Sequence, residues 1–217
     1  MISILIPIKN EPYINKLVDN IRKVVKREHE IIIIDKSKVQ TNIPGVKIIR
    51  QISRGLGNAV LEGLKKSRGD TIVVMDGDGS HRPEDIPKLL DKIGEFDIAI
   101  GSRFTKGGKT NDPQHRRIIS LFFRKFASHV LNIKVEDSMS GFAAMKKKIF
   151  DDIILRPFGY KIIMEIIFKS RKSRIYEVPI IFERRKMGKG NVGINIFGIL
   201  EAFRILLYIF ELRIGIR

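Results

Sequence analysis

The stretch TIVVMDGDGSH, residues 71–81, is the part of the 217-residue chain that most strongly indicates its fold. Its first residues are apolar and mostly β-branched, which predicts a buried strand over residues 71–76. Two acids, Asp76 and Asp78, come at the end of that run, separated by one residue and accompanied by glycines. Ligands bind at the carboxyl ends of the strands in open α/β sheets, so this pattern predicts a ligand site.

Short apolar runs alternate with helical patterns through the first hundred residues. The runs are rich in isoleucine and valine and alternate little, as strands covered on both faces do. We expect strands at residues 2–8, 30–35, 46–49, 71–76 and 97–102. We expect helices between them at residues 12–25, 56–67 and 83–93. Strands and helices in this order predict an α/β fold, a Rossmann-like and mostly parallel sheet flanked by helices.

The pattern changes after residue 102. Residues 104–114 are rich in glycine, lysine and asparagine and are expected to form a mobile loop. A helix is expected at residues 115–131, and residues 138–145 are less regular. Two short helices and a strand are then expected, at residues 148–155, 160–170 and 174–182.

The last stretch, residues 195–217, is apolar but interrupted at helical spacing. Its polar residues predict one narrow stripe on an amphipathic helix, made by Glu201, Arg204, Tyr208 and Glu211. No run of about eighteen uncharged apolar residues exists, so the helix is not expected to span a bilayer. It lies in the membrane interface, or it packs on the domain or on a second protomer. The expected organisation is an α/β domain at residues 1–192 and this helix at 193–217.

The formal net charge of +17 predicts a partner with negative charge. Nucleic acid, an anionic membrane face and phosphorylated substrates all qualify, and a solvated basic surface explains the charge equally well. The chain has no cysteine, which excludes disulfides and thiolate metal sites. It begins with a strand pattern and not with a signal peptide, so we expect a cytoplasmic protein.

The acid pair suggests a metal site. Two crowded carboxylates repel each other, and a divalent cation relieves that repulsion. A hard cation such as Mg²⁺ or Mn²⁺ would bridge Asp76 and Asp78 to a diphosphate. The alternative is a turn in which the aspartates only cap backbone amides.

Eight short motifs, in order over residues 2–192, resemble family 2 glycosyltransferases of GT-A fold. Within that family the chain is similar to the dolichol-phosphate (polyprenyl-phosphate) mannose synthase group. The motifs are IPIKNE (6–11), residues 30–35, GLGNA (55–59), MDGDGSHRP (75–83), GSRF (101–104), DSMSGF (137–142), Met164-Glu165, and EVP (177–179) followed by Arg184-Arg185.

The resemblance implies a nucleotide-diphosphate sugar as donor, with GDP or UDP as the nucleotide. It places Pro7 and Glu11 in the nucleotide pocket, Asp35 near the base or ribose, and Arg185 over the donor diphosphate. It also implies a divalent cation, Mg²⁺ or Mn²⁺, surrounded by Asp76, Asp78 and Ser80.

The resemblance further implies inverting transfer of a hexose, mannose or glucose, to a polyprenyl or dolichyl phosphate. Arg103 and Arg117 resemble the arginines that hold the lipid phosphate, and guanidinium groups suit phosphate oxygens. Asp137 and Glu165 orient sugar hydroxyls or basic groups, or are structural acids. The implied location is the cytoplasmic face of a membrane, as a peripheral protein, with a membrane-protein partner or a homo-oligomer as further options.

The chain departs from the family at two places. Lys36 stands where a second aspartate is usual, and residues 188–191 read GKGN where serine and lysine are expected. Transfer to a hydroxyl acceptor, with Asp137 as general base, is the first alternative function. A nucleic-acid-binding protein is the second, although it leaves the acid pair unexplained and the chain has no tryptophan and four tyrosines for stacking. No nucleic-acid partner is therefore expected.

Overall fold

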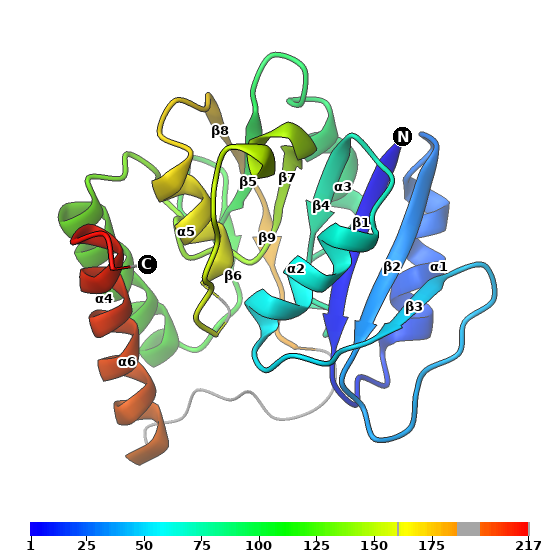
Figure 1. Cartoon of the computed structure of the whole chain (residues 1–217), viewed down its shortest axis with the longest axis horizontal. Helices are drawn as coiled ribbons and strands as arrows, with labels where there is room; N and C mark the ends of the chain where they lie inside the picture. The colour runs from blue at the N-terminus through cyan, green and yellow to red at the C-terminus, as the bar shows by residue number, and fades with distance from the viewer. Residues whose placement is uncertain (160, 186–195, 217) are drawn as a thin grey trace.

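A seven-stranded sheet forms the centre of the protein (Figure 1). The computed structural model describes residues 1–159, 161–185 and 196–216. The sheet order is β3-β2-β1-β4-β7-β5-β8, and only β7 runs antiparallel to its neighbours. The strands are β1 (Ile2–Ile8), β2 (His29–Asp35), β3 (Lys47–Arg50), β4 (Thr71–Val74), β5 (Ile98–Ser102), β7 (Ala143–Lys146) and β8 (Ile175–Pro179). The predicted α/β fold with a mostly parallel sheet is confirmed.

Helices cover both faces of this sheet. Two 3-10 turns, η1 (Pro83–Asp85) and η2 (Lys147–Asp151), accompany them. The helices are α1 (Ile14–Val24), α2 (Leu56–Lys66), α3 (Ile86–Leu90), α4 (Gln114–Leu131), α5 (Ile162–Lys169) and α6 (Ile196–Arg213).

The central strand β1 is buried on both faces, which explains why its sequence barely alternates. Ile4 and Ile6 pack in one core cluster with Leu17 of α1. Leu5 points the other way and packs in a second cluster with Val60 of α2. The sheet is thus held between two apolar layers, which fix the carboxyl ends of β1 and β4 next to each other.

The strand β7 was not predicted, because residues 138–145 were expected to be less regular. It is short, and its buried Ala143 and Ala144 lack the branched side chains by which strands are recognised. It nevertheless fills the gap between β4 and β5 with antiparallel hydrogen bonds. The segment that leads into β7 is brought beside the end of β4 in this way.

Three further expectations need correction. The expected loop at 104–114 contains β6 (Lys109–Thr110), which pairs with β9 (Ile181–Phe182). The strand expected at 174–182 is therefore divided into β8 and β9, which belong to different sheets. The helix expected at 148–155 is only the 3-10 turn η2.

Helix α6 packs beside α4 at the edge of the molecule away from β3 (Figure 1). Tyr208, expected in its polar stripe, is only 1% exposed. Its hydroxyl donates a hydrogen bond to the buried Glu165 of α5 at 2.8 Å. The polar tip of this tyrosine therefore faces inward, toward an acid that spacing along α6 does not reveal. The predicted domain boundary at residue 192 lies outside the described residues.

The outward face of α6 is apolar. Its large exposed hydrophobic residues recur every three or four positions and are Leu200, Phe203, Leu207 and Phe210, and the exposed Ile214 follows directly after the helix. Ile118 and Phe122 of α4 are exposed as well, and Phe126 joins the two helices through Phe210, with ring centroids 5.6 Å apart. We call these seven exposed residues the α4–α6 apolar face. Within the described part of the chain, none of the helices has the length and apolarity to cross a membrane.

Tyr208→Phe should destabilise the fold, because it leaves an oxygen of the buried Glu165 without its donor. Hydrogen bonds to charged groups contribute about 1.5–3 kcal/mol. For a chain of this size that corresponds to a fall in Tm of roughly 3–12 °C, measured by circular dichroism. Tyr176→Phe is the matched control, because Tyr176 is 37% exposed on β8. An equal fall for both variants would contradict the role given to the Tyr208–Glu165 bond.

Candidate active site

The acid pair lies directly after β4, beside the end of β1. Gly77 fits there because it has no side chain: a Cβ at this position would come within 2.6 Å of Ile8 Cγ2. Gly79 has a positive φ of 77°, which turns the chain sharply after Asp78. The two glycines therefore let both acids stay at the sheet edge, where a ligand can reach them.

Ser80 fixes the orientation of Asp78. Its backbone N–H and its hydroxyl both donate to Asp78 Oδ1, at 3.0 and 2.6 Å. Ser80 is only 1% exposed. Ser80 therefore holds Oδ1 of this carboxylate, while Oδ2 lies 3.4 Å from Nε of Arg185.

His81 supports Asp76. The backbone N–H of Asp76 donates to His81 Nδ1 at 3.2 Å, so that nitrogen is the acceptor and the proton resides on Nε2. The ring stacks on Phe142, and Phe182 meets it edge-on, with centroids 5.0 and 5.2 Å away. Burial lowers the pKa of His81 to about 4, so the imidazole is neutral.

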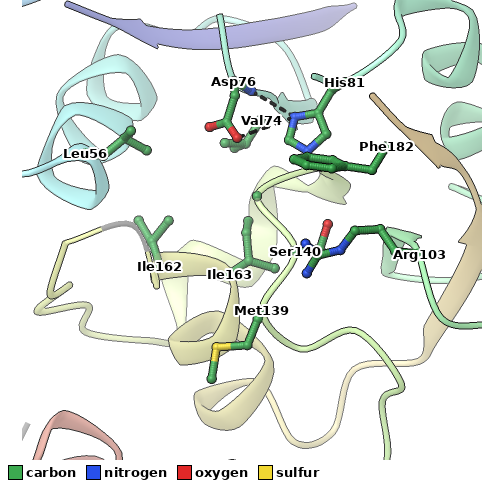
Figure 2. A pocket seen from close by; sticks show the side chains of 11 residues that line it. Leu56, Val74, Asp76, His81, Arg103, Met139, Ser140, Ile162, Ile163 and Phe182 are labelled. Atoms are coloured by element: carbon green, nitrogen blue, oxygen red, sulfur yellow. Dashed lines mark hydrogen bonds and ion pairs between the residues drawn. The ribbon is translucent and has the colours of Figure 1, made fainter. Parts of the chain in front are cut away.

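Asp76 sits at the wall of a small cavity of about 130 Å³. Burial, followed by the negative charge of Asp78, raises the pKa of Asp76 to about 7. Figure 2 shows Asp76 and His81 on one side of the cavity and the guanidinium of Arg103 on another. The cavity is lined by Leu56, Val74, Asp76, His81, Arg103, Met139, Ser140, Gly141, Ile162, Ile163 and Phe182.

Arg103 is held in place by Asp137. Nε and Nη2 of the arginine donate to the two carboxylate oxygens at 2.8 and 2.9 Å, and the backbone N–H of Arg103 donates as well. Asp137 is fully buried, and Arg103 keeps 12% of its side chain exposed. The bidentate pair fixes the guanidinium plane. Asp137 therefore orients Arg103 in this structure.

Arg185 bridges two of the predicted donor-site acids. Nη2 donates to Glu11 Oε2 at 2.8 Å, and Nε lies 3.4 Å from Asp78 Oδ2. Burial raises the pKa of Glu11, and the hydrogen bond from Arg185 offsets this only in part. Oε1 of Glu11 is buried and has no hydrogen-bond partner among the described residues. Glu11 and Arg185, predicted for the donor nucleotide, thus lie together with Asp78, predicted for the metal.

Asp35 at the end of β2 accepts hydrogen bonds from the backbone N–H groups of Ser37 and Thr41, both at 2.8 Å. Lys36 points elsewhere and donates to three backbone carbonyls, those of residues 51, 52 and 53, at 3.0–3.2 Å. The residue that replaces the family's second aspartate thus ties the segment after β3 to the end of β2. Pro7 is buried in β1, where it lies opposite Ile34 of β2, the residue before Asp35.

Of the predicted site residues only Asp76 and Arg103 line this cavity, and two of the others, Arg117 and Glu165, have quite different surroundings. Arg117 is exposed on the first turn of α4 and is not among the lining residues. Glu165 is fully buried and accepts from Tyr208, Lys169 and the backbone N–H of Arg156, so it is a structural acid here. Its helix still matters, because its neighbours Ile162 and Ile163 line the cavity.

Sequence reasoning missed the apolar wall formed by Met139, Ile162, Ile163 and Phe182. Met139 lies within the DSMSGF motif, which is a signal that could have found it. Gly141 in the same motif comes so close to the acids that a Cβ would lie 3.2 Å from Asp76 Oδ2. The isoleucines of α5 carry no signal that separates them from ordinary core residues.

Oxygen atoms of Asp76 and Asp78 suit a hard divalent cation. Asp76 is 33% and Asp78 20% exposed, so both carboxylates can be reached. Among the described residues no cluster of three or more His, Cys, Asp and Glu side chains is arranged to hold a metal. Mg²⁺ characteristically uses one or two carboxylates together with substrate phosphates, and the site fits that kind of binding.

Known proteins with similar sequences transfer sugars to lipid phosphates, as their names state. Dolichol-phosphate mannosyltransferase of Pyrococcus furiosus is 37% identical over 219 residues, which is 92% of this chain and 62% of that protein. Undecaprenyl-phosphate mannosyltransferase of Micrococcus luteus is 33% identical over 71% of this chain and 68% of its own length. Dolichol-phosphate mannosyltransferase of Saccharomyces cerevisiae is 30% identical over 88% and 80%.

The fold is also similar to that of glucosyl-3-phosphoglycerate synthase from Mycobacterium tuberculosis, solved with Mn²⁺, UDP and phosphoglyceric acid. The TM-score is 0.76 at 18% identity, over 99% of this chain and 78% of that one. This likeness confirms the predicted GT-A fold. Residues 3–154 match the sequence profile of glycosyl transferase family 2. With this match over most of its length, the chain belongs to glycosyl transferase family 2.

Proposed function

We propose that this protein moves a hexose, mannose or glucose, from a nucleotide-diphosphate sugar to a polyprenyl or dolichyl phosphate, with inversion at the anomeric carbon. The observation that carries this proposal is the position of Arg103. Its guanidinium is fixed by Asp137 and faces the cavity that Asp76 also lines. An oriented cation across a cavity from Asp76 suits an acceptor that is itself an anion.

A phosphate acceptor simplifies the chemistry. The second pKa of a phosphate monoester is about 6, so its attacking oxygen is ionised at neutral pH and needs no general base. That oxygen forms a bond to the anomeric carbon, and the bond from this carbon to the diphosphate oxygen breaks. The nucleoside diphosphate leaves with the electron pair. Arg103 positions the acceptor phosphate in line for this displacement.

We assign the donor nucleotide to the acidic residues at the ends of β1, β2 and β4. Glu11 has a buried oxygen without a partner among the described residues, which suits a ribose hydroxyl as donor. Asp35 shapes the pocket for the base or ribose through the backbone that it holds. When bound at Asp76 and Asp78, Mg²⁺ or Mn²⁺ supplies positive charge for the departing diphosphate.

A hydroxyl acceptor is less compatible with this site. Such an acceptor needs a general base, and Asp137 was its candidate. Both carboxylate oxygens of Asp137 accept hydrogen bonds from Arg103, and the side chain is fully buried. Protonation of Asp137 would remove the negative charge that pairs with Arg103. Asp137 therefore suits the role of holding Arg103 better than that of a general base.

We infer that the α4–α6 apolar face rests on an anionic membrane surface. Its neighbours Arg117, Lys125, Arg204 and Arg213 are all exposed, so the apolar face is accompanied by positive charge. Amphipathic helices of this kind lie in the membrane interface. The cytoplasmic leaflet carries anionic lipids, and each nearby Lys or Arg gains about 1 kcal/mol there. We therefore assign the protein to the cytoplasmic face as a peripheral protein.

Incubation with labelled GDP- and UDP-sugars and polyprenyl phosphate tests the reaction. Label should appear in the lipid extract and disappear with chelator. Asp78→Ala should lower this transfer at least about 100-fold, because transition-state charge loses its support. Asp19→Ala, at a 63% exposed acid of α1, is the matched control and should be unaffected. Label found only in water-soluble product would contradict the proposed acceptor.

Arg103→Lys should damage the acceptor side selectively. It keeps the positive charge but loses the two-pronged hydrogen bonding of a guanidinium. Because a charged hydrogen bond contributes about 1.5–3 kcal/mol, kcat/KM for the lipid phosphate should fall roughly 10- to 100-fold. The Kd for the nucleoside diphosphate, measured by calorimetry, should change less than about twofold. An equal weakening of nucleotide binding would place Arg103 on the donor side instead.

Serine substitutions at Phe203 and Leu207 together should weaken binding to vesicles that contain phosphatidylglycerol. Both side chains are large and exposed, at 60% and 45%. Losing their burial in lipid should reduce co-sedimentation at least about tenfold. The matched control replaces Ile52 and Ile154, exposed at 87% and 77%, by serine. Unchanged vesicle binding with an altered monomer–dimer equilibrium would assign the face to a second copy of the chain.

A further inference from the structure

Arg185 lies against Glu11 and Asp78, where the negative charge of the acids would also attract a divalent cation. It comes from the segment after β9, far along the chain from the acid motif. Its guanidinium nevertheless lies 2.8 Å from Glu11 Oε2 and 3.4 Å from Asp78 Oδ2. Asp78 Oδ1 is held on its other side by Ser80. The outward oxygen of Asp78 is thus the one that Arg185 approaches.

Charge explains why a cation is needed here. Glu11, Asp76 and Asp78 converge on one small region, and their negative charges repel one another. Arg185 reaches two of these acids directly, since its guanidinium lies 2.8 Å from Glu11 Oε2 and 3.4 Å from Asp78 Oδ2. Arg103 is itself paired with Asp137. Among the described residues, Arg185 is therefore the cation in direct contact with both Glu11 and Asp78.

The five N–H donors of a guanidinium lie in one plane, so the edge of Arg185 that faces the two acids cannot face a diphosphate at the same time. Asp78, Glu11 and the donor diphosphate all suit the same donor groups of Arg185. A divalent cation at Asp78 repels a neighbouring guanidinium and takes over its role as counter-charge. Arg185 then becomes available to a diphosphate. Binding of the divalent cation therefore changes the affinity for the diphosphate, and binding of the diphosphate changes the affinity for the cation.

We propose that Arg185 stands in for the divalent cation in the ligand-free site and exchanges Asp78 for the donor diphosphate when the cation enters. The consequence is cooperative binding: the cation binds weakly alone, because it must displace Arg185, and strongly with nucleotide, because Arg185 then gains a phosphate partner. Linkage makes the effect reciprocal, so the cation strengthens nucleotide binding by the same factor. This inference rests on the proposed function, since it presupposes the cation site at Asp76 and Asp78.

The test measures binding and not turnover. Free Mn²⁺ is followed by electron paramagnetic resonance as protein is added, with and without GDP or UDP. In the wild type the nucleotide should tighten Mn²⁺ binding by a factor in the range of about 5 to 150, the usual size of such coupling. Arg185→Gln should bind Mn²⁺ alone at least about threefold more tightly than the wild type, and its coupling factor should fall toward one.

Arg184→Gln is the matched control. It removes the same charge one residue earlier, where Nε of Arg184 donates to the backbone carbonyl of Asn111 at 3.0 Å and not to the acids. It should keep the coupling factor of the wild type. Thermal melting of each variant checks that the fold is retained.

Two outcomes overturn the inference in distinguishable ways. If Arg185→Gln binds Mn²⁺ alone no more tightly than the wild type does, and its coupling factor is unchanged, Arg185 is not a stand-in while the cation site itself survives. If Asp78→Ala binds Mn²⁺ as the wild type does, with and without nucleotide, the cation is not held at the acid pair. That second result would also refute the proposed cation site.

Discussion

The concentration of negative charge at the ends of β1 and β4 is the constraint on which the rest of the site depends. Asp76, Asp78 and Glu11 are brought together there by the parallel pairing of the two strands and by the turn through Gly77 and Gly79. Burial and the negative charge of Asp78 raise the pKa of Asp76 to about 7, which means that ionising all of these acids together is unfavourable. Cations must compensate it, and the structure supplies Arg185 for that purpose.

The second guanidinium is fixed by a different device. Arg103 forms its ion pair with Asp137 through two hydrogen bonds, and none of its hydrogen bonds within the described residues goes to an acid of the cluster. This pair keeps a rigid cation at the cavity wall that is ready for an external anion. The two arginines thus differ in their partners. Arg185 contacts Glu11 and Asp78, for which we propose donor and cation binding. Arg103 contacts Asp137 and faces the cavity proposed for the acceptor.

The sequence was sufficient for the elements that rely on local pattern. β1 and β4 are buried apolar runs, and the acid pair comes just after β4, so the fold and the place of the acid pair at the sheet edge were predictable. β7 was missed because alanines carry no strand signal. Contacts between distant residues were also beyond reach: Arg103 and Asp137 are 34 residues apart, and Arg185 and Glu11 are 174 apart. Residue spacing along α6 put Tyr208 in an outward polar stripe. The spacing could not reveal that its hydroxyl bonds to Glu165 of another helix.

The most direct test of the account is a crystal structure of the protein with Mn²⁺ and a nucleoside diphosphate, examined at the manganese absorption edge. The account predicts an anomalous peak between the carboxylates of Asp76 and Asp78, in contact with the diphosphate. A peak elsewhere, or a nucleotide bound while those two carboxylates face away from it, would contradict the account.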